Sequence, residues 1–134
     1  MIFVCRINHT AYNRTRRDVQ SHGVNENVRQ SARKVLVIGM RIDAASSPVQ
    51  ALALDGTLIV MEADPTRADE ARRYFSGAGL GTRATVIAGD PRRMLYKLAG
   101  PFDVIFYDAA YVSSRESLER LLAPDGVMIS SENT

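Results

Sequence analysis

Five short apolar runs, rich in β-branched residues and leucine, recur along the chain from residue 34 onward. Apolar runs without polar alternation are typical of parallel strands that are buried on both faces. We expect these strands at 35–38, 57–61, 84–88, 102–107 and 127–131. Alternation of strands with helix-forming segments favours parallel strands and right-handed crossovers. The pattern therefore predicts an α/β fold, a doubly wound and mostly parallel sheet.

Capping residues followed by proline mark where several helices begin, because the cap side chain and proline both suit a first helical turn. The three pairs are Ser47-Pro48, Asp64-Pro65 and Asp90-Pro91. The first helix is expected to end near Leu54, with a turn at Asp55-Gly56 before the second strand. A last helix is expected from about Ser114, and residues 124–126 should turn the chain into the fifth strand.

The N-terminal segment differs from the rest of the chain in charge and pattern. Residues 1–34 carry a net charge of +5, although the whole chain carries only +2. We expect residues 1–33 to form a basic, partly irregular segment and residues 34–134 to form the domain. The apolar run Ile2 to Ile7 is predicted to add a strand beside the fifth strand, unless a homodimer pairs along that edge. The basic segment could also contact nucleic acid, which we consider less favoured.

The overall composition narrows the class of protein. The chain has 134 residues, 46% hydrophobic and 24% charged, as is typical of one globular domain. Its single cysteine, Cys5, excludes an internal disulfide. No apolar run approaches the ~20 residues of a membrane span, and the first residues lack a signal-peptide pattern. We therefore expect a cytoplasmic protein without membrane contact.

Candidate chemistry lies where the predicted strands end. Gly39 closes the first strand, and Glu62 closes the second strand 23 residues later. The glycine allows a ligand to approach the backbone, and the carboxylate can accept hydrogen bonds from ribose hydroxyls. A capping role explains Asp90 without any ligand, whereas it explains neither Glu62 nor Asp108. We therefore expect a ligand with an adenosine-like part.

Five segments in this order carry a family resemblance. They are Val35-Leu-Val-Ile-Gly39, Val60-Met-Glu62-Ala-Asp64-Pro65-x-Arg67-Ala68, Ala88-Gly-Asp90, Gly100-Pro-Phe-Asp103-Val-Ile-Phe-Tyr-Asp108-Ala and Leu122-x-Pro124-x-Gly126-Val-Met-Ile-Ser-Ser-Glu132-Asn133. From residue 34 to 134 the chain resembles the class I S-adenosylmethionine-dependent methyltransferases, most of all the cation-dependent O-methyltransferases of the catechol type. The resemblance implies a Rossmann-like methyltransferase fold that is truncated here after its fifth strand. It also implies S-adenosylmethionine as cofactor and methyl transfer to a hydroxyl of a small-molecule acceptor.

The resemblance also implies roles for single residues. Gly39 would lie under the amino-acid part of the cofactor, and Glu62 would hold the ribose hydroxyls. Ala63 would lie beside the adenine and Asp90 near its amino edge. Asp108 would contribute to cofactor binding and catalysis. The implied ligands of a divalent cation, Mg²⁺ or Ca²⁺, are Asp108, Glu132 and Asn133, whose oxygen atoms suit a hard cation that orients the acceptor.

The chain departs from the family pattern at two places. The family's glycine motif, acid-x-Gly-x-Gly-x-Gly, is here Val37-Ile-Gly39-Met-Arg41-Ile-Asp43. Arg41 is expected either to contact the cofactor's carboxylate or to block the site. Tyr111 stands where the family has a lysine base. It is a candidate catalytic base, although an ordinary tyrosine pKa of about 10 suits this role poorly, and its ring could instead cover the substrate mouth.

Parts of the sequence are also consistent with other functions. The altered glycine loop is consistent with a catalytically impaired domain that has a binding or assembly role. Asp108-Ala-Ala-Tyr111 distantly resembles the Asp-Pro-Pro-Tyr loop of nucleic-acid base methyltransferases, which hold a flipped base. A nicotinamide-dependent dehydrogenase ranks last, since only one glycine of the Gly-x-Gly-x-x-Gly pattern is present.

Overall fold

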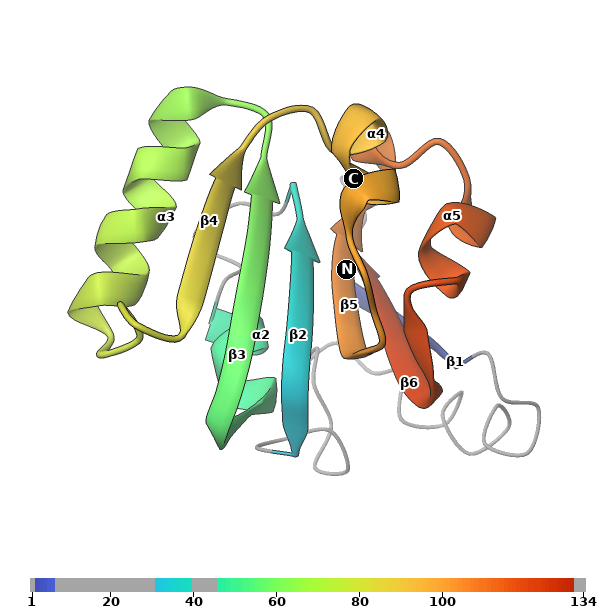
Figure 1. Ribbon diagram of the computed structural model, residues 1–134, viewed down its shortest axis with the longest axis horizontal. Coiled ribbons are helices and arrows are strands. Elements are labelled where there is room, and N and C mark those ends of the chain that lie inside the picture. The colour runs from blue at the N-terminus through green and yellow to red at the C-terminus, as the bar shows by residue number, and fades with distance from the viewer. Residues whose placement is uncertain (1, 7–30, 40–45, 132–134) are drawn as a thin grey trace.

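The computed structural model describes residues 2–6, 31–39 and 46–131, which form one six-stranded sheet (Figure 1). The strand order is β1-β6-β5-β2-β3-β4. The strands are β1 (Ile2–Arg6), β2 (Ala32–Ile38), β3 (Leu52–Glu62), β4 (Ala84–Ala88), β5 (Phe102–Asp108) and β6 (Leu122–Ser131). Strands β2 to β6 pair in parallel, and β1 pairs antiparallel with β6. The predicted α/β class and mostly parallel sheet are confirmed.

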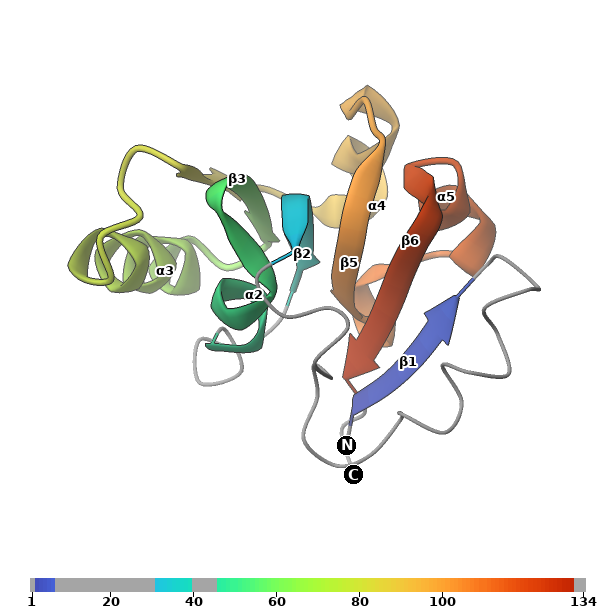
Figure 2. The ribbon, with the colours of Figure 1, turned by 90° about the horizontal axis from the view of Figure 1, so that it is seen from below.

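Helices cover both faces of the sheet, as a doubly wound fold requires. The helical elements are α2 (Ser46–Ala51), α3 (Pro65–Gly77), α4 (Pro91–Met94), α5 (Arg115–Glu119) and the 3₁₀ turns η2 (Leu95–Lys97) and η3 (Ala109–Tyr111). Figure 2 shows α2 and α3 on one side of the strands and α4 and α5 on the other. No helix within the described ranges is long and apolar enough to cross a membrane.

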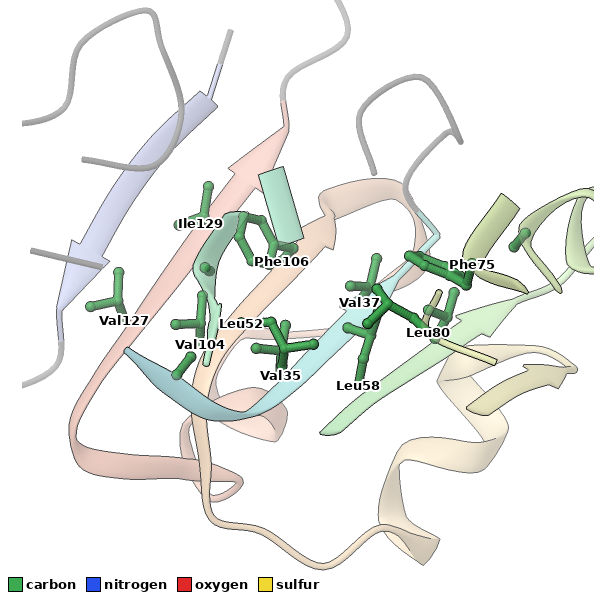
Figure 3. Packing of buried hydrophobic residues seen from close by; sticks show 14 residues of the cluster. Val35, Val37, Leu52, Leu58, Phe75, Leu80, Val104, Phe106, Val127 and Ile129 are labelled. Carbon is green, nitrogen blue, oxygen red and sulfur yellow. The ribbon is translucent and has the colours of Figure 1, made fainter. Parts of the chain in front are cut away.

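Alternate residues of each central strand pack into two separate cores. The core beneath α2 and α3 contains Val35, Val37, Val104, Phe106, Val127 and Ile129 (Figure 3). The opposite core contains Leu36, Ile38, Ile105, Tyr107 and Met128 and is closed by Leu95 and Leu118. Side chains of a strand alternate between its faces, so a strand that is buried on both faces needs a continuous apolar run. This explains why the apolar runs located the central strands correctly.

Two of the three predicted cap-and-proline pairs are confirmed, whereas Ser47-Pro48 lies inside α2, which begins at Ser46. The side chain of Asp64 accepts a hydrogen bond from the Thr66 N–H at 2.9 Å, and α3 begins at Pro65. Asp90 accepts from the Arg92 N–H at 3.0 Å. Ser114 caps α5 in the same way. Each cap satisfies an N–H of the first helical turn and fixes where the chain leaves the strand before it.

Two predicted turns lie inside strands instead. The helix expected to reach Leu54 ends at Ala51, and Asp55-Gly56 belongs to β3. Between the pairs Ala32–Leu52 and Lys34–Thr57, β2 advances by two residues and β3 by five, so β3 bulges. The guanidinium of Arg83 donates to three carbonyl groups of this bulge, those of Ala53, Leu54 and Gly56, at 2.6–3.2 Å.

A similar bulge replaces the turn expected at residues 124–126. Between the pairs Phe102–Leu122 and Val104–Val127, β5 advances by two residues and β6 by five. Pairing therefore continues on both sides of the extra residues, which remain part of β6. A bulge of this kind keeps the strand in the sheet while it accommodates turn-forming residues.

The edge of the sheet beyond β6 is occupied by β1. The register runs from Ile2 opposite Ser131 to Arg6 opposite Val127. This is the strand expected from the apolar run that begins at Ile2, and it gives β6 a neighbour on each side. The division of the chain at residues 33 and 34 remains a prediction, and β2 begins at Ala32.

Candidate functional site

The candidate site lies at the carboxyl ends of β2, β3, β4 and β5, which meet at one edge of the sheet (Figure 1). Two backbone hydrogen bonds join the segments that follow these strands. The Gly39 N–H donates to the Met61 carbonyl at 2.9 Å, and the Gly89 N–H donates to the Glu62 carbonyl at 2.9 Å. The end of β3 is thus held between two glycines, one on each neighbouring segment. Ligands of open α/β sheets bind at this edge.

Glu62 is a charged side chain buried at this edge, with 2% of its surface exposed. One carboxylate oxygen, Oε1, accepts a hydrogen bond from the Asp64 N–H at 3.3 Å and lies 3.6 Å from the Arg67 guanidinium. Burial raises the pKa of the Glu62 carboxyl above its ordinary value, and the nearby Asp64 charge acts in the same direction. The Asp64 N–H and Arg67 oppose this rise without cancelling it.

The second oxygen of the Glu62 carboxylate, Oε2, is the atom that a ligand could use. Both contacts of Glu62 use Oε1, so Oε2 has no hydrogen-bond or ion-pair partner in the part of the chain that the structure describes. A buried carboxylate oxygen without a partner is unfavourable. A ligand hydroxyl that donates to Oε2 would remove this cost. Sequence reasoning identified Glu62 but gave Arg67 no role, although its position on the first turn of α3 after the cap could have indicated one.

Gly39 adopts a left-handed conformation with φ of +69°, which favours glycine. A Cβ atom at this position would also lie 2.9 Å from Cγ of Tyr111, so the Tyr111 ring packs on the bare face of the glycine. The structure thus brings together two residues that are 72 positions apart, a pairing that the sequence analysis did not anticipate. The contact follows from the pairing of β2 with β5, which places Ile38 opposite Tyr107 and brings the ends of the two strands together.

Asp108 caps the short turn that contains Tyr111. It ends β5, and its Oδ1 accepts a hydrogen bond from the Ala110 N–H at 2.9 Å, which caps η3. The Val112 N–H closes the same turn on the Ala109 carbonyl at 3.3 Å. The expectation that capping does not explain Asp108 is therefore wrong. The cofactor, cation and catalytic roles of Asp108 remain predictions.

Ala63 and Asp90 also lie at the edge. Ala63 is exposed directly after Glu62. Asp90 accepts from the backbone N–H and the Nε of Arg92, at 3.0 and 3.3 Å, and these contacts lower the pKa of its carboxyl. Capping accounts for this geometry, and the role of Asp90 near an adenine remains a prediction. Sequence reasoning gave no site role to Met94, whose sulfur lies against Gly89 where a Cβ atom would stand.

Part of the predicted site lies outside the described residues. Arg41, Glu132 and Asn133 belong to this part, so Asp108 is the member of the implied cation set whose position is known. Within the described ranges, no three His, Cys, Asp or Glu side chains gather in a way that could hold a metal ion. The cation site therefore remains a prediction.

The fold and the site together define the class of protein. A parallel sheet of this order, with an acidic residue ending the strand next to the glycine-terminated one, is the Rossmann-like arrangement of class I methyltransferases. The chain belongs to the O-methyltransferase family, whose model matches residues 7–134. No curated protein sequence matches the chain.

Solved structures agree with this assignment. An O-methyltransferase from Bacillus cereus in complex with SAH is 28% identical, with a TM-score of 0.66 over 85% of this chain and 60% of its own. The O-methyltransferase TomG from Streptomyces achromogenes, in complex with SAM, is 26% identical, with a TM-score of 0.65 over 75% and 49%. A cofactor-bound protein from MTB is 30% identical, with a TM-score of 0.65 over 74% and 48%. The chain thus spans roughly half the length of these proteins.

Proposed function

We propose that this domain binds S-adenosylmethionine and transfers its methyl group to a hydroxyl of a small-molecule acceptor. The observation that carries the proposal is the buried Glu62 carboxylate at the edge of the sheet, one oxygen of which has no partner among the described residues. Membership of the O-methyltransferase family and the SAM and SAH complexes of similar proteins support it.

The residues at the edge fit the cofactor. Glu62 would accept hydrogen bonds from the ribose, and the bare backbone of Gly39 would approach the amino-acid part. Ala63 and Asp90 would lie on the adenine side. The bound cofactor supplies an electrophilic methyl group on a sulfonium centre. The chain's own contribution is to hold that methyl group and the acceptor oxygen in line, which converts a bimolecular reaction into an oriented one.

The acceptor side of the site is proposed to involve Asp108, together with Glu132 and Asn133. Oxygen ligands of this kind suit Mg²⁺ or Ca²⁺, which would lower the pKa of an acceptor hydroxyl. A base function for the Tyr111 hydroxyl remains a prediction. The packing of the Tyr111 ring on Gly39 favours instead the alternative in which the aromatic ring covers the site.

Binding of S-adenosylhomocysteine, measured by calorimetry, tests the proposal. We expect the unmodified protein to bind, and Glu62→Gln to bind about tenfold more weakly or worse, because a charge-assisted hydrogen bond contributes ~1.5–3 kcal/mol. Glu70→Gln is the matched control, since Glu70 is an exposed acid on α3. Absence of binding to the unmodified protein at millimolar ligand would contradict the proposal.

A second candidate is a methyltransferase-like domain with a binding or assembly role and no catalysis. The observation that favours it is the Tyr111 ring, which occupies the face of Gly39 that a cofactor would approach. Transfer of a labelled methyl group to a panel of small hydroxyl compounds separates the two candidates. Cofactor binding without transfer to any acceptor would favour the second. The same ring position does not support base flipping, because Tyr111 packs on Gly39 instead of being available to stack on a base.

A further inference from the structure

The Tyr111 ring packs against Gly39 at the edge of the sheet where the proposed cofactor would bind. A Cβ atom added to Gly39 would lie 2.9 Å from Cγ and 3.0 Å from Cε2 of the ring, and would overlap Cδ2. The ring therefore covers the side of Gly39 from which a side chain is missing. A glycine at such a position is useful to a ligand only if that side is open.

The covering position of the ring is stabilised but not locked. Its apolar part packs against the core that contains Ile38 and Tyr107, while the ring itself is only partly buried. The backbone beneath it is a single 3₁₀ turn, held by the cap from Asp108 and one closing hydrogen bond. A side chain on such a short turn can change its rotamer without any movement of the sheet.

We propose that the Tyr111 ring is a stopper that must leave Gly39 before the cofactor's amino-acid part can bind. This inference rests on the proposed function, because it concerns the same cofactor. In the resting protein the ring and the ligand compete for one surface. The apparent affinity for the ligand is then the intrinsic affinity multiplied by the fraction of molecules in which the ring has moved away.

The stopper acts through its ring and not through its hydroxyl group. Removing the ring should therefore increase the affinity, whereas removing the hydroxyl alone should leave the affinity unchanged. If the Tyr111 hydroxyl is instead the catalytic base, Tyr111→Phe should abolish methyl transfer. The two roles can thus be separated by the same pair of variants.

Calorimetry with S-adenosylhomocysteine on three variants tests the stopper. We expect Tyr111→Ala to bind about fivefold more tightly than the unmodified protein, and Tyr111→Phe to bind equally well. Tyr96→Ala, which removes a tyrosine that is 70% exposed on η2, is the matched control and should bind equally well. Unchanged or weaker binding by Tyr111→Ala, with binding by the unmodified protein, would overturn the stopper and leave the proposed function standing.

A measurement on the unmodified protein gives a second test. Nuclear Overhauser contacts between the Gly39 α-protons and the Tyr111 ring should be present without ligand and lost when S-adenosylhomocysteine is added. Contacts that persist in the complex would show that the ring is a fixed wall of the site, which overturns the stopper. If neither the unmodified protein nor Tyr111→Ala binds the ligand, the stopper and the proposed function both fail.

Discussion

Glu62 shows how a single residue can be unfavourable for folding and useful for binding. Burial raises the pKa of its carboxyl, and the Asp64 N–H and Arg67 compensate only in part. A charged group in such a place lowers the stability of the free domain. The same desolvation strengthens any hydrogen bond that a ligand hydroxyl makes to the carboxylate. A residue that lowers the stability of the free domain and is stabilised by a bound ligand is typical of a functional site.

The raised pKa of Glu62 predicts a pH-dependent cost in stability. Because the folded-state pKa lies above the unfolded value of 4.5, the unfolded state loses its proton first as the pH rises. Stability from this group is therefore complete below pH 4.5 and is lost as the pH rises through the folded-state pKa. We expect Glu62→Gln to gain stability relative to the unmodified protein between about pH 4 and pH 7, measured by urea unfolding.

Two features of this experiment make it decisive. Glu70→Gln removes one exposed negative charge from α3 and controls for the change in net charge. A gain for Glu62→Gln that is the same at both pH values would show that titration of Glu62 is not its source. A variant that is more stable yet binds the cofactor more weakly would also exclude misfolding as the reason for weak binding.

At the scale of elements, the two strand bulges explain which parts of the fold the sequence could reveal. The apolar runs of β2 and β5 correspond closely to the observed strands, since burial on both faces requires them. The run of β4 also matches its strand, although β4 lies at the edge of the sheet and is only partly buried. Asp55-Gly56 has the composition of a turn but lies in β3, because Arg83 satisfies the carbonyl groups of the extra residues. Nothing in the local sequence identifies an arginine 27 residues further along the chain as the partner of Gly56.

The same reasoning applies to the candidate site. Gly39, Glu62 and Asp108 could be predicted because each ends an apolar run, and strand ends are visible in the sequence. The packing of Tyr111 on Gly39 could not, since it depends on the pairing of β2 with β5 and on the direction of a three-residue turn. A contact that depends on both the order of the strands and the rotamer of a side chain cannot be predicted from a single sequence motif.

Arg83 is expected to stabilise the β3 bulge. Its guanidinium donates to three carbonyl groups, and each hydrogen bond from a charged group contributes ~1.5–3 kcal/mol in buried settings and less where solvent competes. We therefore predict that Arg83→Ala lowers the free energy of unfolding by about 2 kcal/mol, as measured with urea.

Arg93→Ala is a suitable control for this prediction, because Arg93 is an exposed arginine on α4. A loss of equal size in both variants would indicate an effect of net charge. Hydrogen exchange should also show faster exchange in β3 residues near the bulge for Arg83→Ala than for the control.

At the scale of the whole molecule, β1 completes one side of the sheet. It pairs with β6 over five residues, from Ile2 to Arg6, and it is the one antiparallel strand among those described. An unpaired strand edge promotes association with other chains. β1 therefore protects an edge that the parallel part of the sheet would otherwise expose.

Removal of residues 1–7 should expose the β6 edge. We expect the shortened chain to associate at micromolar concentration, as seen by light scattering after gel filtration, while the full chain at the same concentration scatters less. The parallel strands do not depend on β1 for their own pairing, so the circular dichroism of the helices should be retained. Equal scattering from the two chains would contradict a protective role for β1.

The pairing of β1 with β6 also sets an order of events during synthesis. The residues that pair are about 120 positions apart, since Arg6 lies opposite Val127. At a translation rate of about 5–20 residues per second, β1 leaves the ribosome roughly 6–25 seconds before its partner exists. During this interval the first strand is a short apolar segment that nothing in the sheet can yet receive. Assembly of this edge must therefore wait until β6 has been synthesised, after all the other strands of the described sheet.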